Sequence, residues 1–206
     1  RSEKIAAWIP WETTGDFESV TELNGEIFVS VKRTVNSSVV YYLEKFNFLK
    51  TVDCSVTLSN VSGNIWQGLS HLVASSVSCV DSNIYHGDFT VDGSGRITLN
   101  ETGTAPVAGL NFTRTIIDMP ANIQGPSGSK RGVQKMVGEI IVEVFAVNDQ
   151  EFLIRQVDDD LSTSPAAVTG TFQFYGGGWS RDAQVTITQT APLKGTVLSI
   201  WKEILA

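Results

Sequence analysis

The sequence contains few cysteines and histidines, two of each among 206 residues, and no long apolar run. Two cysteines cannot form the framework of a disulfide-rich scaffold, and neither has the spacing to further Cys or His residues that zinc sites require. Cys54 and Cys79 lie in alternating, strand-like segments, so we predict buried free thiols, with a single disulfide as the alternative. No run approaches 18 apolar residues, so we predict no membrane segment.

Basic residues are also scarce: 15 Lys and Arg stand against 22 Asp and Glu, a formal charge of −7. Proteins that hold DNA do so with clusters of Lys and Arg that release counterions. The densest basic pair here is Lys130-Arg131, so we do not expect specific nucleic-acid binding. An acidic surface would repel DNA, which suits the wall of a channel through which DNA slides. The alternative is that the negative charge only keeps the protein soluble.

Patterns typical of catalysis are missing. His71 follows Ser70 in a short apolar connector, where packing or capping is the better interpretation, and His86 lies two residues before Asp88. The Gly-x-Ser-x-Gly elbow is absent, because residues 125–129 fail at the last position. Glu18 and Glu22 flank Val20 on a strand, about 13 Å apart, which is wide for a glycosidase pair.

Two further motifs indicate structure rather than chemistry. Gly176-Gly177-Gly178 lacks the Lys-Ser/Thr that reaches phosphates, so we interpret it as a tight turn or a close backbone approach that breaks a strand. Asp158-Asp159-Asp160 are consecutive, and such residues seldom converge on one calcium ion, so we expect a solvated loop. We therefore predict no enzyme, with no catalytic, cofactor-binding or metal-binding residue and no cofactor.

Strand patterns dominate the first 50 residues. Asn24-Gly25 separates two alternating runs, residues 17–23 and 26–33, and this pair is the strongest short-range hairpin signal. A two-residue turn places Val20 opposite Val29. A third run at 39–43 completes an antiparallel meander, a pattern that a propeller blade would also give.

Later segments repeat the strand pattern. We expect runs at 75–80, 84–89, 96–100, 169–175, 184–189 and 196–204 to be strands, with residues 92–95 as a hairpin loop. Residues 133–147 fit both a helical stripe and a strand with one apolar face from Met136 to Ala146; abundant Val and Ile and a central Gly138 favour the strand. Residues 120–132 are expected to form an exposed, mobile loop. The predicted class is all-β, with a meander at 1–50 followed by a β-sandwich or barrel-like domain at 51–206.

Five tryptophans occur, at positions 8, 11, 66, 179 and 201. Core packing is the default interpretation, and anchoring of an interface, for example by Trp8 or Trp179, is the alternative.

The order of several short motifs resembles a known family. They are WETTGDFESV at residues 11–20, VSVKR at 29–33, VYYLE at 40–44, GLSHL at 68–72, SVSCVD at 76–81, GLNF at 109–112 and APL at 191–193. This succession resembles the C-terminal part of the tail tubular protein B family, the tail nozzle or tail stabilisation proteins of short-tailed bacteriophages. The family usually continues after Leu72 with Glu-Gly, whereas this chain has Val73-Ala74.

The resemblance implies a structural role in the virion. Such proteins are β-rich, often with a propeller-like part, and form six-fold rings beneath the portal and adaptor, around the channel through which the genome leaves. It implies a homo-oligomer, made in the bacterial cytoplasm, that contacts the adaptor and a fibre or needle while DNA passes without specific binding. Members are larger and the chain begins at Arg1 without a cleavable apolar segment, so we expect a piece of a longer protein. The alternative is a β-sandwich module that binds carbohydrate or another receptor.

Overall fold

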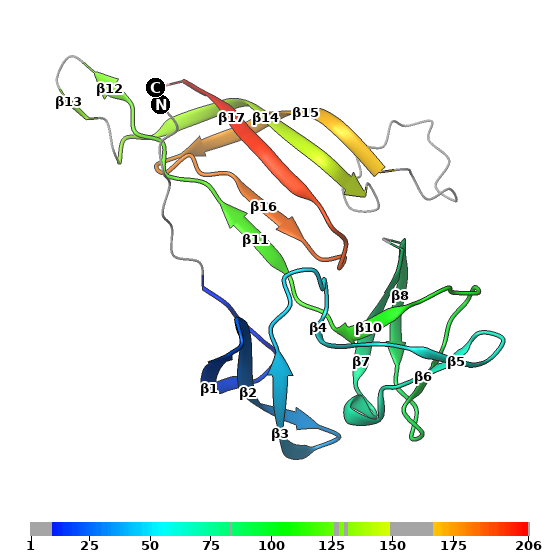
Figure 1. Cartoon of the computed structure of the whole chain (residues 1–206). Coiled ribbons are helices and arrows are strands. Elements are labelled where there is room, and N and C mark those ends of the chain that lie inside the picture. Colours follow the sequence, from blue (N-terminus) through cyan, green and yellow to red (C-terminus); the bar gives the residue numbers. More distant parts are fainter. Residues whose placement is uncertain (1–9, 83, 126–127, 130–131, 149–166, 206) are drawn as a thin grey trace. The chain divides into compact units, whose positions relative to one another are not determined.

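The computed structural model describes residues 10–82, 84–125, 128–129, 132–148 and 167–205. These residues form strands and a single 3-10 turn, η1 (Ser70–Leu72), which confirms the all-β prediction (Figure 1). The chain separates into two compact units: unit 1 ends at residue 112 and unit 2 begins at residue 113, with Ile84 and Tyr85 also grouped with unit 2. Closure into a barrel or propeller stays a prediction.

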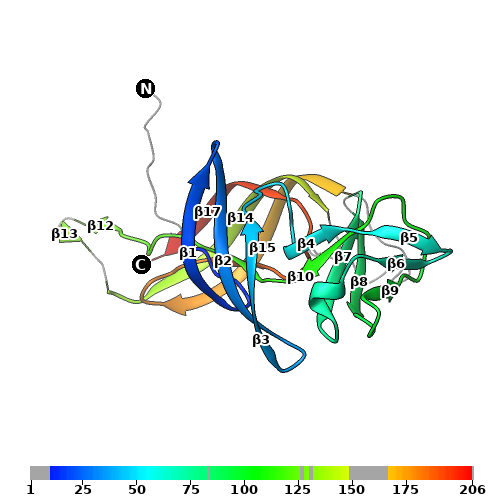
Figure 2. The ribbon, with the colours of Figure 1, turned by 60° about the horizontal axis from the view of Figure 1, so that its bottom comes forward.

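Unit 1 begins with a three-stranded antiparallel sheet, here called the meander. It consists of β1 (Asp16–Leu23), β2 (Glu26–Val35) and β3 (Ser38–Lys45), in that order, and Figure 2 shows the three strands side by side. The φ angles of Asn24 and Gly25 are 54° and 79°, so both turn residues are left-handed as the hairpin requires. Val20 pairs with Val29, which confirms the predicted register.

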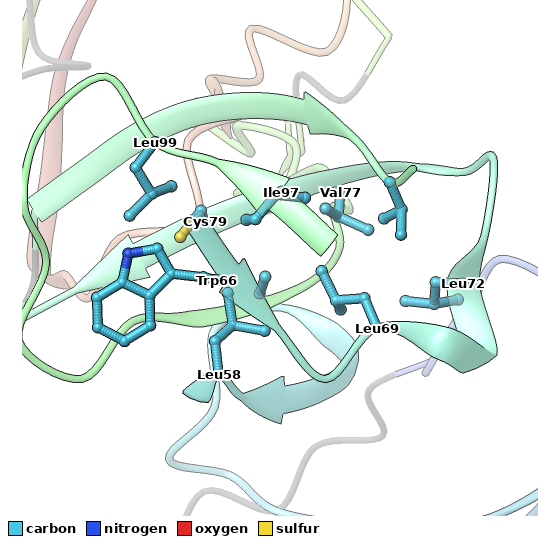
Figure 3. Packing of buried hydrophobic residues seen from close by; sticks show 10 residues of the cluster. Leu58, Trp66, Leu69, Leu72, Val77, Cys79, Ile97 and Leu99 are labelled. Carbon is cyan, nitrogen blue, oxygen red and sulfur yellow. The ribbon is translucent and has the colours of Figure 1, made fainter. Parts of the chain in front are cut away.

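Two more sheets of unit 1 enclose its main core. One has the order β4 (Asp53–Thr57), β10 (Val107–Leu110), β7 (Ser76–Asp81), β8 (Ile84–Thr90); the other has the order β5 (Ser59–Ser62), β6 (Ile65–Gln67), β9 (Arg96–Thr98). Figure 3 shows side chains from both sheets and from η1 meeting in one cluster. Its buried members are Leu58, Trp66, Leu69, Leu72, Val77, Cys79, Val91, Ile97, Leu99 and Ala108.

The turn at residues 92–95 corrects the predicted hairpin. The Asp92 carboxylate accepts hydrogen bonds from the backbone N–H groups of Ser94 and Arg96, at 2.8 and 2.9 Å, so the turn itself is present. The strands on its two sides nevertheless belong to different sheets, because β9 pairs with β6 and β8 lies beside β7. Pairing with β6 sets Ile97 opposite Trp66, and both side chains are buried in the core.

Unit 2 is organised around the predicted long strand, now β14 (Lys135–Asn148), which confirms strand over helix for this segment. It lies between β15 (Ala167–Ser180) and β17 (Thr196–Leu205), while β11 (Arg114–Ile117) pairs with β16 (Thr186–Gln189). Val142 and Val144 are buried, and side chains from three other strands pack against them: Phe172, Phe174, Ile187 and Val197.

A bulge at Gly138 overturns the prediction of one uninterrupted apolar face on β14. Val137 pairs with Gly178 but Glu139 pairs with Tyr175, so two glycines of β15 stand opposite one residue of β14. On its other side, Val137 pairs with Ile204 of β17 and Ile140 pairs with Lys202, so Gly138 and Glu139 stand opposite the single Glu203. This extra residue of β14 changes which side of the strand faces the core, and Val137 is buried in place of Met136. The triple glycine is therefore a bulge within β15, not a break between strands.

Two other segments add to the sequence analysis. Arg33 and Tyr42 of the meander bond to Asp53 and to the carbonyl of His71, so side chains connect the meander with the chain that follows it; a separate domain at residues 1–50 stays a prediction. The stretch 120–132 is not wholly an exposed loop. Ala121 is buried, and β12 (Gln124–Gly125) pairs with β13 (Gly128–Ser129).

None of the described residues belongs to a helix of the length and apolar character needed to cross a membrane.

Candidate functional site

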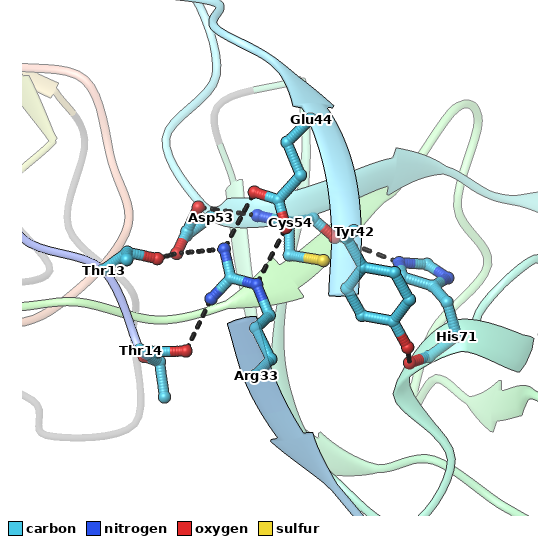
Figure 4. Close-up of polar contacts among 8 residues, drawn as sticks. All are labelled: Thr13, Thr14, Arg33, Tyr42, Glu44, Asp53, Cys54 and His71. Carbon is cyan, nitrogen blue, oxygen red and sulfur yellow. Dashed lines mark hydrogen bonds and ion pairs between the residues drawn. The ribbon is translucent and has the colours of Figure 1, made fainter. Parts of the chain in front are cut away.

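The most elaborate polar cluster of unit 1 surrounds the Arg33 guanidinium, whose side chain is only 1% exposed (Figure 4). Its Nε and Nη2 donate to the two carboxylate oxygens of Glu44, both at 2.8 Å, and Nη2 also donates to Asp53 Oδ2 at 3.0 Å. Nη1 donates to the Thr14 carbonyl at 2.7 Å, and the Thr13 hydroxyl donates to Asp53. One side chain thus joins β2, β3, β4 and the segment before β1.

Opposite charges hold Arg33 in its ionised form. Burial by itself would lower the pKa of the guanidinium, but the hydrogen bond to Glu44 and the charges of Asp53 and Glu44 raise it above the ordinary value. The two carboxylates are in turn compensated by the bidentate guanidinium, which is the geometry that makes such pairs strong. The cluster of Arg33, Glu44, Asp53, Thr13 and Thr14 therefore links the meander to β4, and we call it the Arg33 bolt.

Cys54, His71 and Tyr42 lie beside this cluster but are not arranged for catalysis. The His71 Nε2 lies 3.1 Å from the carbonyl of Cys54, and the Tyr42 hydroxyl donates to the carbonyl of His71 at 2.6 Å. Burial, followed by the nearby Glu44, raises the pKa of the Cys54 thiol to about 12, so it is not a thiolate nucleophile at neutral pH. These side chains bond backbone carbonyls, which agrees with the structural role predicted for His71.

The other candidate catalytic groups are likewise not assembled as a triad. Ser78 donates directly to Asp88, with no imidazole between them. Glu18 lies at the bulge between Phe17 and Ser19, and Glu22 accepts the Gly25 N–H at 2.6 Å. Across the described part of the chain, no three His, Cys, Asp or Glu side chains group closely enough to hold a metal ion. Asp158–Asp160, Lys130-Arg131 and Trp8 lie outside the described residues.

An apolar groove adjoins the Arg33 cluster on the same face of the meander. Its volume is about 540 Å³, and it is lined by Trp11, Phe17, Glu18, Ser19, Val20, Ile27, Val29, Phe46 and Phe48. Trp11, Phe46 and Phe48 form a triangle of edge-to-face contacts with ring centroids 4.6 to 5.6 Å apart. Val20 is 71% exposed, and Trp11 and Phe48 are also largely exposed.

This groove is the candidate functional site. A contiguous exposed apolar patch on a folded protein commonly marks an interaction surface. At one end of the sheet the Arg33 cluster covers the face of β2, and at the other end Val20, Ile27 and the rings of Trp11 and Phe48 are exposed to solvent. The arrangement can bind apolar side chains.

The sequence located parts of this site and missed others. The alternation of β1 and β2 identified Val20 and Val29 as one face. Arg33 was not singled out, because its partners Glu44 and Asp53 are 11 and 20 residues away and no local pattern connects them. Of the tryptophans, Trp66 is in the core as the default interpretation predicted, whereas Trp11, Trp179 and Trp201 are exposed, which contradicts it for these three.

Both cysteines are free, as predicted; Cys79 is buried and Cys54 half-buried. Burial raises the pKa of each thiol from 9.0 to about 12. Between these values the unfolded thiol loses its proton while the folded one keeps it, so the unfolded state binds fewer protons and stability falls as pH rises.

We expect the free energy of unfolding to decrease between pH 8.5 and 9.8, measured by urea denaturation across this range. In the double variant Cys54→Ser/Cys79→Ser this decrease should be smaller. An identical pH dependence in both proteins would contradict the buried-thiol interpretation.

No protein-family model matches the chain, and no curated protein matches it.

Proposed function

We propose that this chain is a structural component of a bacteriophage tail, a nozzle or tube element that forms part of a ring around the DNA exit channel. The observation that carries the proposal is the open apolar groove of the meander. A ring of identical subunits needs a surface on each copy that receives a different surface of the next copy. The groove offers such a receptor for apolar side chains of a second copy.

One detail of the backbone supports the resemblance on which the proposal also rests. Ala74 has a φ of 62°, a left-handed conformation that favours glycine, and the Ser75 N–H bonds the Leu72 carbonyl at 3.0 Å to close the turn. This is the position at which the family pattern has glycine. The turn therefore requires a left-handed backbone conformation at residue 74, which the glycine of a Glu-Gly pair would adopt without strain.

The proposal places the protein in the virion, as a homo-oligomer of six-fold symmetry that contacts the adaptor and a fibre or needle. DNA would pass the ring without specific binding, in keeping with the formal charge of −7. We propose no enzymatic activity, since the clustered polar groups of unit 1 bond one another and the backbone.

Substituting Val20 by aspartate is expected to abolish ring formation, because it would place a charge in the apolar groove. Rings would be counted by negative-stain electron microscopy and mass photometry, and virions would be searched for the protein by mass spectrometry. The matched control is Val39→Asp, since Val39 is 58% exposed on the opposite face of the same sheet. Absence of rings at all concentrations, together with absence from virions, would refute the proposal.

A carbohydrate- or receptor-binding module is the second candidate. It is favoured by a different observation, the exposure of Trp179 and Trp201 on unit 2. Saturable binding on a glycan array that is lost in a Trp→Ala variant would favour this candidate over the ring component.

A further inference from the structure

The sheet β15-β14-β17 of unit 2 has two unlike faces. Val142 and Val144 point to the core, so the alternate residues of β14 point away from it. The register extends this outward face to both neighbouring strands: Glu139 pairs with Tyr175, and Ile141 pairs with Trp201. Trp179 pairs with Met136, on the side opposite the buried Val137.

We call this surface the aromatic-acidic face. Its members are Glu139, Ile141, Glu143, Phe145, Gln173, Tyr175, Trp179, Trp201 and Glu203. Tyr175, Trp179 and Trp201 are 76%, 66% and 68% exposed, so large rings lie open on both edge strands. Exposed Trp and Tyr are the residues most enriched at binding hot spots.

The carboxylates of this face are not neutralised by cations of their own sheet. The sequence of the three strands contains two cationic residues, Lys135 and Lys202. Lys135 is buried and donates to the carbonyls of Val133 and Arg181 at 3.2 and 2.9 Å. Lys202 pairs with Asp118 at 2.7 Å and also donates to two backbone carbonyls, those of Met119 and Ala183.

The remaining groups of the face also attract positive charge. The faces of aromatic rings carry negative potential, so exposed Trp and Tyr bind cations. Glu143 can accept a hydrogen bond from an outside donor, as it already does from the Ser199 hydroxyl at 3.1 Å. A purely apolar partner would bury Glu139 and Glu143 without compensation, and a nucleic acid would be repelled.

We propose that the aromatic-acidic face binds an arginine-bearing segment of a partner protein. Charge complementarity selects a cation, and arginine fits better than lysine because its planar guanidinium both stacks on aromatic rings and bonds carboxylates in a bidentate manner. The inference goes beyond the ring proposal and does not depend on it, since it concerns unit 2 and a different occupant.

The test is fluorescence anisotropy of a labelled hexa-arginine peptide titrated with the full chain. We expect saturable binding that weakens with added salt and that exceeds the binding of hexalysine. Glu139→Gln/Glu143→Gln should weaken it by about 2- to 25-fold, the sum of two exposed charge pairs. Trp201→Ala should weaken it by about 2- to 5-fold through loss of stacking.

The control separates a specific site from attraction to an acidic protein. Glu12→Gln/Glu101→Gln removes the same charge from exposed positions of unit 1 and should leave the affinity unchanged. An equal loss in both double variants would overturn the proposal, as would saturable binding of a neutral hexasaccharide without binding of hexa-arginine. Circular dichroism of each variant checks that the fold is retained, and Trp201→Ala, which keeps the net charge, provides the independent second variant.

Discussion

Replacing Arg33 by alanine is expected to lower the free energy of unfolding by about 3 kcal/mol, near the lower end of the range for breaking a buried ion pair. The loss of stability comes from the two carboxylates that pair with Arg33. Glu44 and Asp53 have side chains only 16% and 23% exposed, and without the guanidinium both carboxylates would remain largely removed from water without a counter-charge. The measurement is urea denaturation followed by tryptophan fluorescence.

Two further variants show whether the geometry or the charge matters. Arg33→Lys keeps a cation but cannot form the two parallel bonds to Glu44, so its stability should fall between those of wild type and Arg33→Ala. Lys45→Ala breaks the exposed pair with Glu26 on the neighbouring strand and should cost less than about 1 kcal/mol. If Arg33→Ala were no more destabilising than Lys45→Ala, the bolt would have no energetic importance.

Gly95→Ala is the second substitution for which we expect a large loss, about 2 to 4 kcal/mol. Gly95 has a φ of +72°, and a Cβ placed there would lie 2.5 Å from the backbone nitrogen of Ser70 and 2.7 Å from its Cα. Backbone cannot move aside as a flexible side chain can, so overpacking adds to the strain of the left-handed conformation. The carbonyl of Gly95 also accepts the Leu69 N–H at 3.0 Å, a bond that any displacement would weaken.

The neighbouring Gly93 gives a control within the same turn. No atom lies within 4 Å of the position that its Cβ would occupy, and its φ is not in the left-handed region. Gly93→Ala should therefore change the free energy of unfolding by no more than about 0.5 kcal/mol. Thermal and urea unfolding of the two variants would decide, and equal stabilities would show that the contact between this turn and η1 is unimportant.

Local patterns predicted local structure well. Asn24-Gly25 was enough to predict the turn and the pairing of Val20 with Val29, because both depend on neighbouring residues alone. The strand at 133–147 was also predictable, since β-branched residues determined the choice between two periodicities. The all-β class followed from many such segments.

Pairings between distant segments were not predictable in this way. β9 pairs with β6 and not with β8. This pairing places Ile97 and Trp66 together in a core whose other members come from five further segments. The Arg33 bolt has the same character, since each of its partners lies in another element. The bulge at Gly138 escaped prediction because the alternation of β14 alone does not reveal the one extra residue in β15.

Because of that bulge, the number of residues near Gly138 determines which side chains of β14 face the core as much as the residue types do. Upstream of it Val137 faces inward, whereas downstream the inward residues are Val142 and Val144, so odd and even positions exchange places at this point. Deleting Gly138 would leave β14 in unbroken alternation, with Val137, Val142 and Val144 on one side, but it would leave both Gly176 and Gly177 of β15 without an opposite residue. Substitutions can accumulate in this strand, but insertions and deletions must be matched by its partner, so the two segments are constrained to change length together.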